Sequence, residues 1–416
     1  MPRRVAAICL AAALVCSRAP AQTVSQRGFV EGTGFAFPQQ AANDPTRIVE
    51  DLLARDEVFV TPVDWLQLAG GVDVRANSHD QVEHAWRVDF SDRGIRRPRF
   101  SIRRLAADVH RGRFDVSIGK QFIRWGKTDI VTPTDRFAPR DFLNVIDSDF
   151  LAVTGVRASA RAGSDTFEGV WVPRFTPGRV PLLDQRWTVV PPGAAGVRLV
   201  DAGSVLPRGS QIGLRWSHVG DGFEYAATFF DGFNYLPDIG TALVGGASPE
   251  APPEVAVSRE YPPIRMYGGS AAVPTRWLTI KGEAGYFTSA SRTTDEYVLY
   301  VVQLERQTGE WLFVGGYAGE AVTRRRAALT FAPDRGLTRS LVGRASYTID
   351  TNRDLVFEAA VRQNGDGAYV KGEYSQAYGG HWRATLDGIA IRGQADDFLG
   401  QYRRNSYAAV TLRYSF

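Results

Sequence analysis

Charged side chains of both signs are concentrated in residues 120–141, where aromatic residues lie between them. The set is Lys120, Arg124, Lys127, Asp129, Asp135, Arg136, Arg140 and Asp141. Opposed charges in a narrow, partly dehydrated passage set up a transverse field on a solute, as rings of charge do in channels. The alternative is an exposed loop whose ion pairs only order the backbone and contribute little each. The residue types leave both interpretations open, and the aromatic content slightly favours the first.

A second set of charged residues falls on alternate positions of predicted strands and would share one face. Its members are Arg75, Arg103, Arg215, Lys281, Glu283, Arg344, Glu358, Arg362, Lys371, Glu373, Arg383, Asp387 and Arg413. Only 4 of the 49 basic residues are lysine, so this face is rich in guanidinium groups, which bind carboxylates and phosphates bidentately. Such a lumen would favour anionic solutes. The alternative is that the many arginines reflect GC-rich codon usage and that Arg–Glu and Arg–Asp pairs brace neighbouring strands against each other. The near-zero net charge makes this alternative at least as well supported.

Residues suited to catalysis or to cofactors are scattered along the chain. The histidines are His79, His84, His110, His218 and His381, and His79 and His84 lie in a predicted loop without helical register to bring their rings onto one metal ion. No Gly-x-Ser-x-Gly elbow and no phosphate-binding loop is present. We therefore expect no catalytic, cofactor-binding or metal site, and an outer-membrane enzyme is the least favoured interpretation.

The elements that would position these residues follow one repeated pattern of period-2 alternation. In residues 65–76, Leu66 and Leu68 share one face, whereas Gln67, Asp73 and Arg75 share the other. A half-buried antiparallel strand requires this alternation, because successive side chains point to opposite faces. The sequence is therefore predicted to be all-β.

The spacing of the strands predicts a transmembrane barrel. Eighteen strands are expected, with sixteen as the alternative, at about 28–37, 48–61, 65–76, 99–110, 113–123, 151–162, 166–173, 208–219, 222–232, 263–273, 277–287, 296–306, 311–322, 339–350, 353–363, 367–378, 382–392 and 404–416. Turns of two to four residues alternate with generally long segments such as 124–150 and 174–207. Short periplasmic turns and long extracellular loops are typical of antiparallel outer-membrane barrels.

The first 22 residues have the pattern of a cleaved signal peptide. Arg3 and Arg4 precede an apolar stretch, and the small residues around Ala21 predict cleavage after it. The rest of the chain then has no cysteine, which excludes disulfides and thiolate sites. Without Arg3, Arg4 and Arg18 the 49 basic residues become 46 against 45 acidic ones, so a nucleic-acid partner is not expected.

Aromatic residues lie at the predicted membrane boundaries. Trp65, Trp277, Trp311 and Trp382 each follow a short turn, as expected for part of an aromatic girdle. The last predicted strand alternates small or apolar residues with Thr411, Arg413 and Ser415 and ends at Phe416. It resembles the terminal strand by which the assembly machinery recognises outer-membrane barrels, and this resemblance implies that Phe416 is an assembly signal.

A longer resemblance covers about residues 99–175. The signature region of a family of large bacterial outer-membrane barrels, some grouped with alginate-export and porin-like proteins, is similar to this part of the chain. The motifs that carry the resemblance are Gly119-Lys120-Gln121, Trp125-Gly126, Asp135-Arg136 and Pro139-Arg140-Asp141. The resemblance implies the barrel fold and an outer-membrane location. It slightly favours a segment at 120–150 folded into the lumen of a single barrel spanning 23–416.

The expected function is that of a porin-like channel for passive passage or export of polar solutes, small or polymeric. The alternative is a non-catalytic barrel subunit of a secretion, lipid-export or electron-transfer complex, with a periplasmic partner protein. The other expected partners are outer-membrane lipid, lipopolysaccharide and the barrel-assembly machinery.

Overall fold

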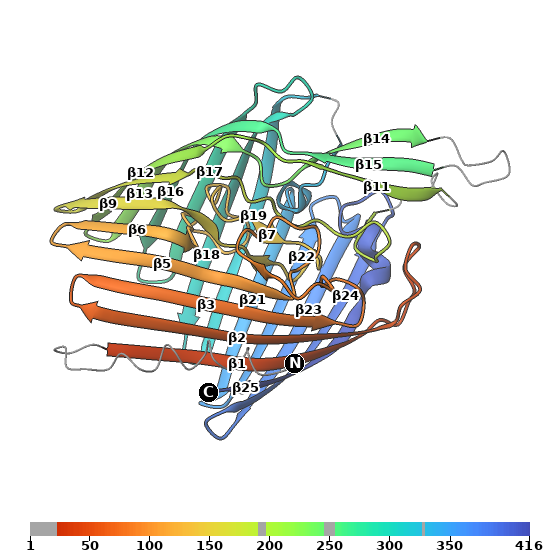
Figure 1. The fold of residues 1–416 in the computed structure, drawn as a ribbon, viewed down its shortest axis with the longest axis horizontal. Coiled ribbons are helices and arrows are strands. Elements are labelled where there is room, and N and C mark those ends of the chain that lie inside the picture. The colour runs from red at the N-terminus through yellow and green to blue at the C-terminus, as the bar shows by residue number, and fades with distance from the viewer. Residues whose placement is uncertain (1–22, 190–196, 245–253, 327–328) are drawn as a thin grey trace, which may run out of the picture.

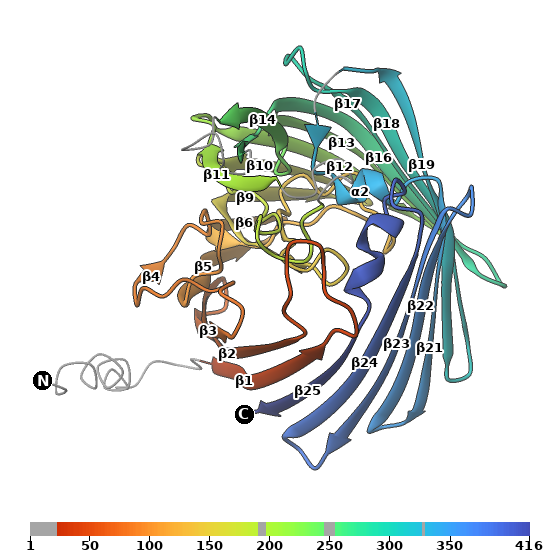
Figure 2. The ribbon, with the colours of Figure 1, turned by 90° about the vertical axis from the view of Figure 1, so that its right-hand side faces the viewer.

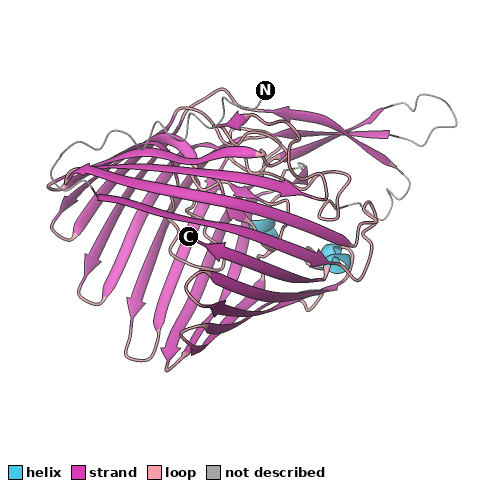
Figure 3. Cartoon of the chain, turned by 60° about the horizontal axis from the view of Figure 1, so that its bottom comes forward, coloured by secondary structure: helices cyan, strands magenta, loops and turns pink. Residues whose placement is uncertain are grey.

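The computed structural model describes residues 23–189, 197–244, 254–326 and 329–416. The predicted signal peptide and its cleavage position at Ala21 lie outside the described residues. Within them the chain is almost entirely strand and loop (Figure 3).

Eighteen antiparallel strands form a closed barrel, because β1 pairs with both β2 and β25 (Figures 1 and 2). In barrel order they are β1 (Thr23–Ala36), β2 (Ile48–Val63), β3 (Leu66–Asn77), β5 (Phe100–Arg111), β6 (Phe114–Gln121), β9 (Val153–Ala162), β10 (Asp165–Val172), β12 (Gln211–Gly220), β13 (Phe223–Phe233), β16 (Pro263–Pro274), β17 (Thr279–Thr288), β18 (Glu296–Thr308), β19 (Trp311–Arg324), β21 (Ser340–Asp350), β22 (Arg353–Arg362), β23 (Gly367–Tyr378), β24 (Trp382–Gly393) and β25 (Tyr407–Ser415). The prediction of eighteen strands is confirmed.

The strand ends differ from the predicted ones by a few residues, for local reasons. β6 ends at Gln121, soon after Gly119, whose φ of +125° and closeness to the Leu105 carbonyl exclude a side chain. β25 begins only at Tyr407, because the 3₁₀ helix η3 (Gly400–Asn405) occupies the preceding residues.

The outer face of the barrel is apolar. Leu341, Phe357, Val370 and Leu412 are examples of large hydrophobic side chains that are about half exposed or more there. An outward apolar band is what lets a barrel span a membrane, since closure satisfies every backbone hydrogen bond within the sheet. The architecture is that of a bacterial outer-membrane barrel.

The two ends of the barrel differ, as the connection lengths predict. At the short-turn end, Trp65, Trp277, Trp311 and Trp382 are all exposed beside their turns. None of the helices in the described ranges is long and apolar enough to cross a membrane.

The long loops contain strands that the alternation does not reveal. β11 (Arg198–Val205), β15 (Glu254–Glu260), β14 (Asp238–Val244) and β20 (Leu329–Thr330) form a separate four-stranded sheet. Its β11, β14 and β15 extend beyond the barrel wall (Figure 1). Shorter elements are β4 (Val88–Asp89), which pairs in parallel with β5, the pair β7 (Arg140–Asp141) and β8 (Asp149–Phe150), and helix α2 (Pro333–Gly336).

Candidate functional site

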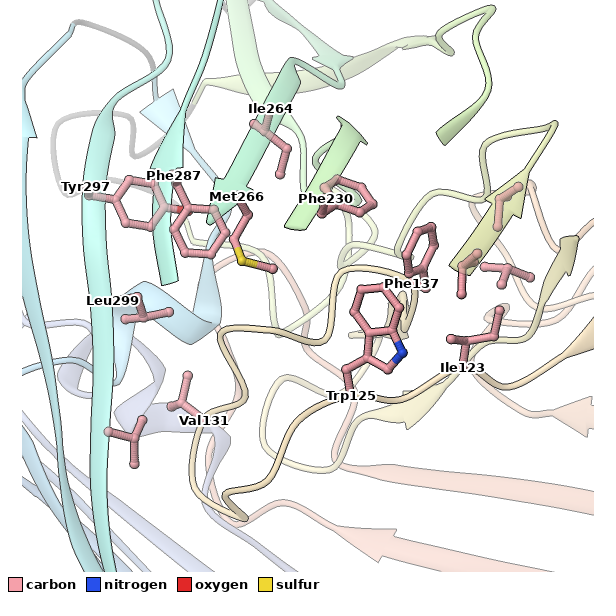
Figure 4. Close-up of a cluster of buried hydrophobic side chains, with 14 of the residues drawn as sticks. Ile123, Trp125, Val131, Phe137, Phe230, Ile264, Met266, Phe287, Tyr297 and Leu299 are labelled. Carbon is pink, nitrogen blue, oxygen red and sulfur yellow. The ribbon is translucent and has the colours of Figure 1, made fainter. Parts of the chain in front are cut away.

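The segment at residues 122–150 packs against the inner face of one half of the barrel. Its Ile123, Trp125, Val131 and Phe137 are buried in one hydrophobic cluster with inward side chains of β9 to β19 (Figure 4). The strand residues of this cluster are Val153, Val170, Val172, Phe230, Ile264, Met266, Phe287, Tyr297, Leu299, Val301 and Ala318. We call the inner face of β9 to β19 the apolar half. Burial of these side chains drives docking of the segment.

Glu283 of β17 is the main polar anchor of the segment. Its Oε2 accepts hydrogen bonds from the backbone N–H groups of Lys127 (2.7 Å) and Thr128 (3.1 Å) and from the Thr128 hydroxyl (3.1 Å). Its Oε1 accepts from the N–H and the hydroxyl of Thr134, both at 2.8 Å. The carboxylate is 3% exposed, so five donors replace the water it has lost.

Two further contacts fix the segment in this half. The Asp135 carboxylate accepts the N–H groups of Trp125 and Gly126 at 2.5 and 2.6 Å, and the Trp125 indole donates to Glu168 of β10. Gln303 of β18 exchanges two hydrogen bonds with Asp129, at 2.8 Å from the Asp129 N–H and 2.6 Å to its carboxylate.

The far part of the segment reaches the opposite wall. Asp147 accepts from Lys371 Nζ of β23 at 2.6 Å and from the Tyr407 hydroxyl of β25. Asp149 lies 3.8 Å from the guanidinium of Arg75 on β3. The segment thus crosses from β17 and β18 to β3, β23 and β25.

A cavity of about 280 Å³ remains between this part of the segment and the opposite wall. Charged side chains of both signs line it, among them Arg75, Asp147, Asp149, Lys371 and Asp387. Glu31, Thr33, Asp51, Asn77 and Thr411 of β1, β2, β3 and β25 add further polar groups. Apolar side chains also line it, namely Phe35, Phe37, Val49, Leu53, Leu143 and Trp187. We call the inner face of β1 to β5 and β21 to β25 the polar half. Charged walls of this kind hold water, because ions in a dry site carry a large desolvation cost.

The extracellular loops are tied to the segment by a chain of buried ion pairs. Asp141 forms ion pairs with Arg97 at 2.8 Å and with Arg179 at 3.2 Å. Arg179 also pairs with Asp92 at 2.9 Å, and Asp92 pairs in turn with Lys120 at 2.6 Å. Burial alone would raise the pKa of Asp141, but Arg97 and Arg179 outweigh it and hold that pKa well below its usual range. Asp141 therefore stays ionised at neutral pH.

The predicted constriction residues divide into buried and solvent-accessible groups. Lys120, Asp135, Arg136 and Asp141 are buried, whereas Lys127 and Arg140 are half-buried and Arg124 and Asp129 are exposed. Arg136 stacks on Phe287 and Tyr235 and lies 3.7 Å from Asp334, so its charge is held within the apolar half. Arg124 and Arg140 both lie over the Phe150 ring, at 4.2 and 4.1 Å.

Most of the predicted inward residues have partners of opposite charge. Arg75 and Arg103 approach Asp73, Lys281 binds Glu305 at 2.6 Å, and Arg362 binds Asp397. Arg383 lies near Asp354 and Arg413 binds Glu31. Three others are placed only by strand register: Arg215 lies opposite Glu168, Arg344 lies opposite Glu358, and Glu373 lies opposite a second carboxylate, Asp387. Tyr369 donates to Glu358.

Sequence reasoning missed Asp147, Asp149 and Gln303, which shape the cavity or hold the segment. One available signal was the run Tyr297-Val298-Leu299-Tyr300-Val301-Val302 in β18, which is apolar at successive positions. In a water-filled barrel the inward positions should be polar, so an unbroken apolar run indicates that something packs inside.

Four of the five histidines each pair with a different carboxylate, and His381 bonds the Ser415 backbone oxygen. His79 binds Asp44 at 2.8 Å, and His84 binds Asp80 at 2.9 Å, so the two rings do not share a ligand. Across the described ranges, no group of three His, Cys, Asp or Glu side chains is placed to hold a metal ion.

Comparison with known proteins identifies the fold. No family model and no curated protein matches the sequence. Among solved structures, the chain resembles a BenF-like porin from Pseudomonas fluorescens Pf-5, with a TM-score of 0.55 at 9% identity over 95% of this chain and 98% of that one. It resembles Acinetobacter baumannii OccAB4 with 0.55 at 10%, over 96% and 100%. Pseudomonas aeruginosa OccK2 (OpdF), solved in complex with glucuronate, gives 0.51 at 9%, over 95% of each chain. The chain has the fold of outer-membrane porins.

Proposed function

We propose that the protein is an outer-membrane channel through which small polar solutes diffuse along the polar half of the lumen. The observation that carries the proposal is the cavity between the segment and the wall, whose lining includes the ion pairs of Asp147 with Lys371 and of Asp149 with Arg75. Charged groups of both signs along a narrow passage order water and orient a passing solute. The segment at 122–150 is the constriction in this proposal.

The proposed solutes are small and hydrophilic, including organic acids. Arg75 and Lys371 supply cations beside the passage, and the similar barrel OccK2 was solved with the sugar acid glucuronate. Their pairing with Asp149 and Asp147 argues against a strong preference for anions. The Arg-rich set predicted for the inner face is consistent with both solute binding and bracing of the strands.

Single-channel recording of the purified barrel in a planar bilayer tests this function. We expect steady ohmic conductance that glucuronate and a neutral sugar of similar size both reduce in a concentration-dependent way. A barrel that serves as a sleeve for a periplasmic partner should conduct little until the partner or the segment is removed. Absence of measurable conductance from correctly folded, heat-modifiable protein would overturn the proposal.

The assembly role of Phe416 belongs to the same proposal. The Phe416 backbone exchanges hydrogen bonds with Gly28 at 3.0 and 3.1 Å, and its ring lies where a Gly28 side chain would be. Phe416 therefore sits at the seam where β25 meets β1. If the assembly machinery recognises Phe416, the same residue that it binds would also complete the pairing of β25 with β1 that closes the barrel.

A further inference from the structure

The outer face of the barrel carries an apolar groove across β18 to β23, which lie side by side in Figure 2. Gly315, Gly343, Ala345 and Ala359 form its floor, and its volume is about 480 Å³. Its sides are Leu278, Leu304, Phe313, Phe357 and Val370. Most of these side chains belong to the exposed, membrane-facing surface described above.

The groove exists because small residues are paired across neighbouring strands. Gly315 of β19 is opposite Gly343 of β21, and Phe313 is opposite Ala345. A Cβ added at Gly315 or Gly343 would meet no atom closer than 3.9 Å, and neither backbone has a positive φ. Neither close packing nor backbone conformation therefore requires glycine there. The missing side chains leave space in the wall that an elongated apolar group can fill.

An unpaired cation lies at the end of the groove nearest the short turns. Arg306 lines the groove, two residues before the β18 position that pairs with Trp311, and its side chain is exposed. Among the described residues no carboxylate lies within 4 Å of it. Arg276, also exposed, stacks on Trp277 at 4.7 Å in the turn that leads to Leu278. Guanidinium groups at a membrane boundary bind phosphate bidentately.

A second groove on the outer face provides an internal contrast. It lies around Gly169 and Ala227, between β10 and β13, and has a volume of about 460 Å³. Its lining includes Glu168 and Arg215, which lie opposite each other in strand register. Near it, Asp165 binds the Trp216 indole and His218, both at 2.9 Å. A carboxylate repels phosphate, so this groove has the apolar shape without the headgroup chemistry.

We propose that the groove at Gly315 and Gly343 binds one acyl chain of a phospholipid from the periplasmic leaflet, with Arg306 holding the lipid phosphate. Charge complementarity selects this occupant over a second copy of the chain. Glu305 and Glu358 also line the groove, but they bind Lys281 and Tyr369, and within the described ranges Arg306 has no carboxylate partner. Lipopolysaccharide carries phosphate too, but it occupies the opposite leaflet. The inference does not depend on the transport proposal.

Lipid retention by the full barrel tests the proposal. Protein reconstituted in vesicles of phosphatidylethanolamine and phosphatidylglycerol would be extracted in mild detergent, washed, and assayed for bound phospholipid by native mass spectrometry. We expect the wild-type barrel to retain phospholipid, and Gly343→Leu, Gly315→Leu and Arg306→Gln each to reduce retention severalfold. Gly169→Leu fills the second groove, and Arg113→Gln removes an exposed guanidinium that stacks on Phe114 at another short turn. Both controls should retain lipid like the wild type.

Equal retention by all variants would overturn the proposal, and so would loss with Arg306→Gln but not with either leucine variant. A change of oligomeric state with the leucine variants would assign the groove to a second copy and overturn it too. Retention of lipopolysaccharide in place of phospholipid from native membranes would also overturn it. Unchanged heat-modifiability establishes that each variant is folded.

Discussion

The two halves of the barrel interior share one backbone architecture and differ in what their inward positions carry. In the apolar half, Phe230, Met266 and Leu299 are fully buried against the segment. In the polar half, Arg75 and Lys371 line a cavity, and a second hydrophobic cluster there includes Ile389 of β24 and Val145 of the segment. Alternation decides only that a residue faces inward. The type of the inward residue decides whether a loop docks or water remains, because apolar area gains by burial whereas charges lose hydration.

Charges have different roles in the two halves. Glu283 in the apolar half is buried, and its carboxylate accepts hydrogen bonds from five groups of the segment. Asp147 and Asp149 in the polar half remain exposed while they face cations of the wall. We infer that the first kind of charge determines where the constriction sits, and the second kind determines which solutes pass it.

The largest expected effect is that of Glu283→Ala. The variant leaves four donors of the segment without their acceptor, because the Thr128 hydroxyl also donates to the Val131 carbonyl at 2.6 Å. Hydrogen bonds to a charged group contribute roughly 1.5–3 kcal/mol each. We expect the segment to leave the apolar half and single-channel conductance to rise severalfold with frequent fluctuations. Glu305→Ala removes a half-buried carboxylate that pairs with Lys281, and it should change conductance little. Equal conductance of both variants and the wild type would show that Glu283 does not hold a constriction.

A second large effect is expected at Asp141. Asp141→Asn leaves Arg97 and Arg179 buried without their shared charge partner, which costs about 3–5 kcal/mol for a buried pair. Hydrogen exchange of the loops around Arg97 and Arg179 should become fast, while exchange in β17 and β18 stays slow. Uniformly faster exchange throughout the barrel would contradict a local role.

The same network predicts a pH dependence. The folded-state pKa of Asp141 is depressed, so its contribution is fully present above the unfolded pKa of about 3.9 and is lost as pH falls towards the folded value. The protection factors of these loops, which correct exchange for its intrinsic pH dependence, should therefore stay constant from pH 7 to about 5 and fall only in stronger acid. A fall beginning near pH 6 would point to a different titrating group.

Charge removal in the two halves should change selectivity differently. Arg75→Ala with Lys371→Ala removes cations beside the cavity, and we expect the reversal potential in a salt gradient to shift towards cation preference. Arg136→Met removes a buried cation of the apolar half and should mainly lower stability. If Arg136→Met shifts the reversal potential as much as the double variant does, the passage does not follow the polar half.

The smallest effect on the difference between the two halves is expected where β25 pairs with β1, at the edge of the polar half that closes the barrel. Phe416→Ser keeps the two backbone hydrogen bonds to Gly28 but loses the ring that packs over it. Outer-membrane levels should fall and the envelope stress response should rise, while Asn364→Ser in the β22 to β23 turn should assemble normally. Equal levels of the two variants would remove Phe416 as an assembly signal.

Much of the barrel could be predicted because the signal is local. Alternation of period 2 and short turns are visible within ten residues, and all eighteen strands follow from them. The sheet of β11, β14, β15 and β20 could not be found this way. Its β11 pairs in parallel with β15, more than fifty positions further along the chain, and neither strand shows clean alternation.

The candidate site was predictable only in part. Alternation indicates that Glu283 faces inward, yet its contacts with Thr128 and Thr134 depend on a loop about 150 residues away in sequence. The charges at 120–141 were visible as a cluster, but their separation into buried and exposed groups was not. Lys120 and Asp141 are buried because loop residues Asp92, Arg97 and Arg179 cover them.

The strands, their inward and outward faces and the two ends of the barrel follow from the amino-acid order, because each depends on side-chain periodicity within a strand or a turn. Docking of the segment at 122–150 on β9 to β19, with the cavity left beside β1 to β3 and β23 to β25, depends instead on contacts between distant parts of the chain. The segment docks where burial of Trp125 and Phe137 gains free energy, and the cavity stays where Arg75 and Lys371 would lose hydration if they were covered. These groups come from distant parts of the chain, and closure of the barrel first brings them face to face.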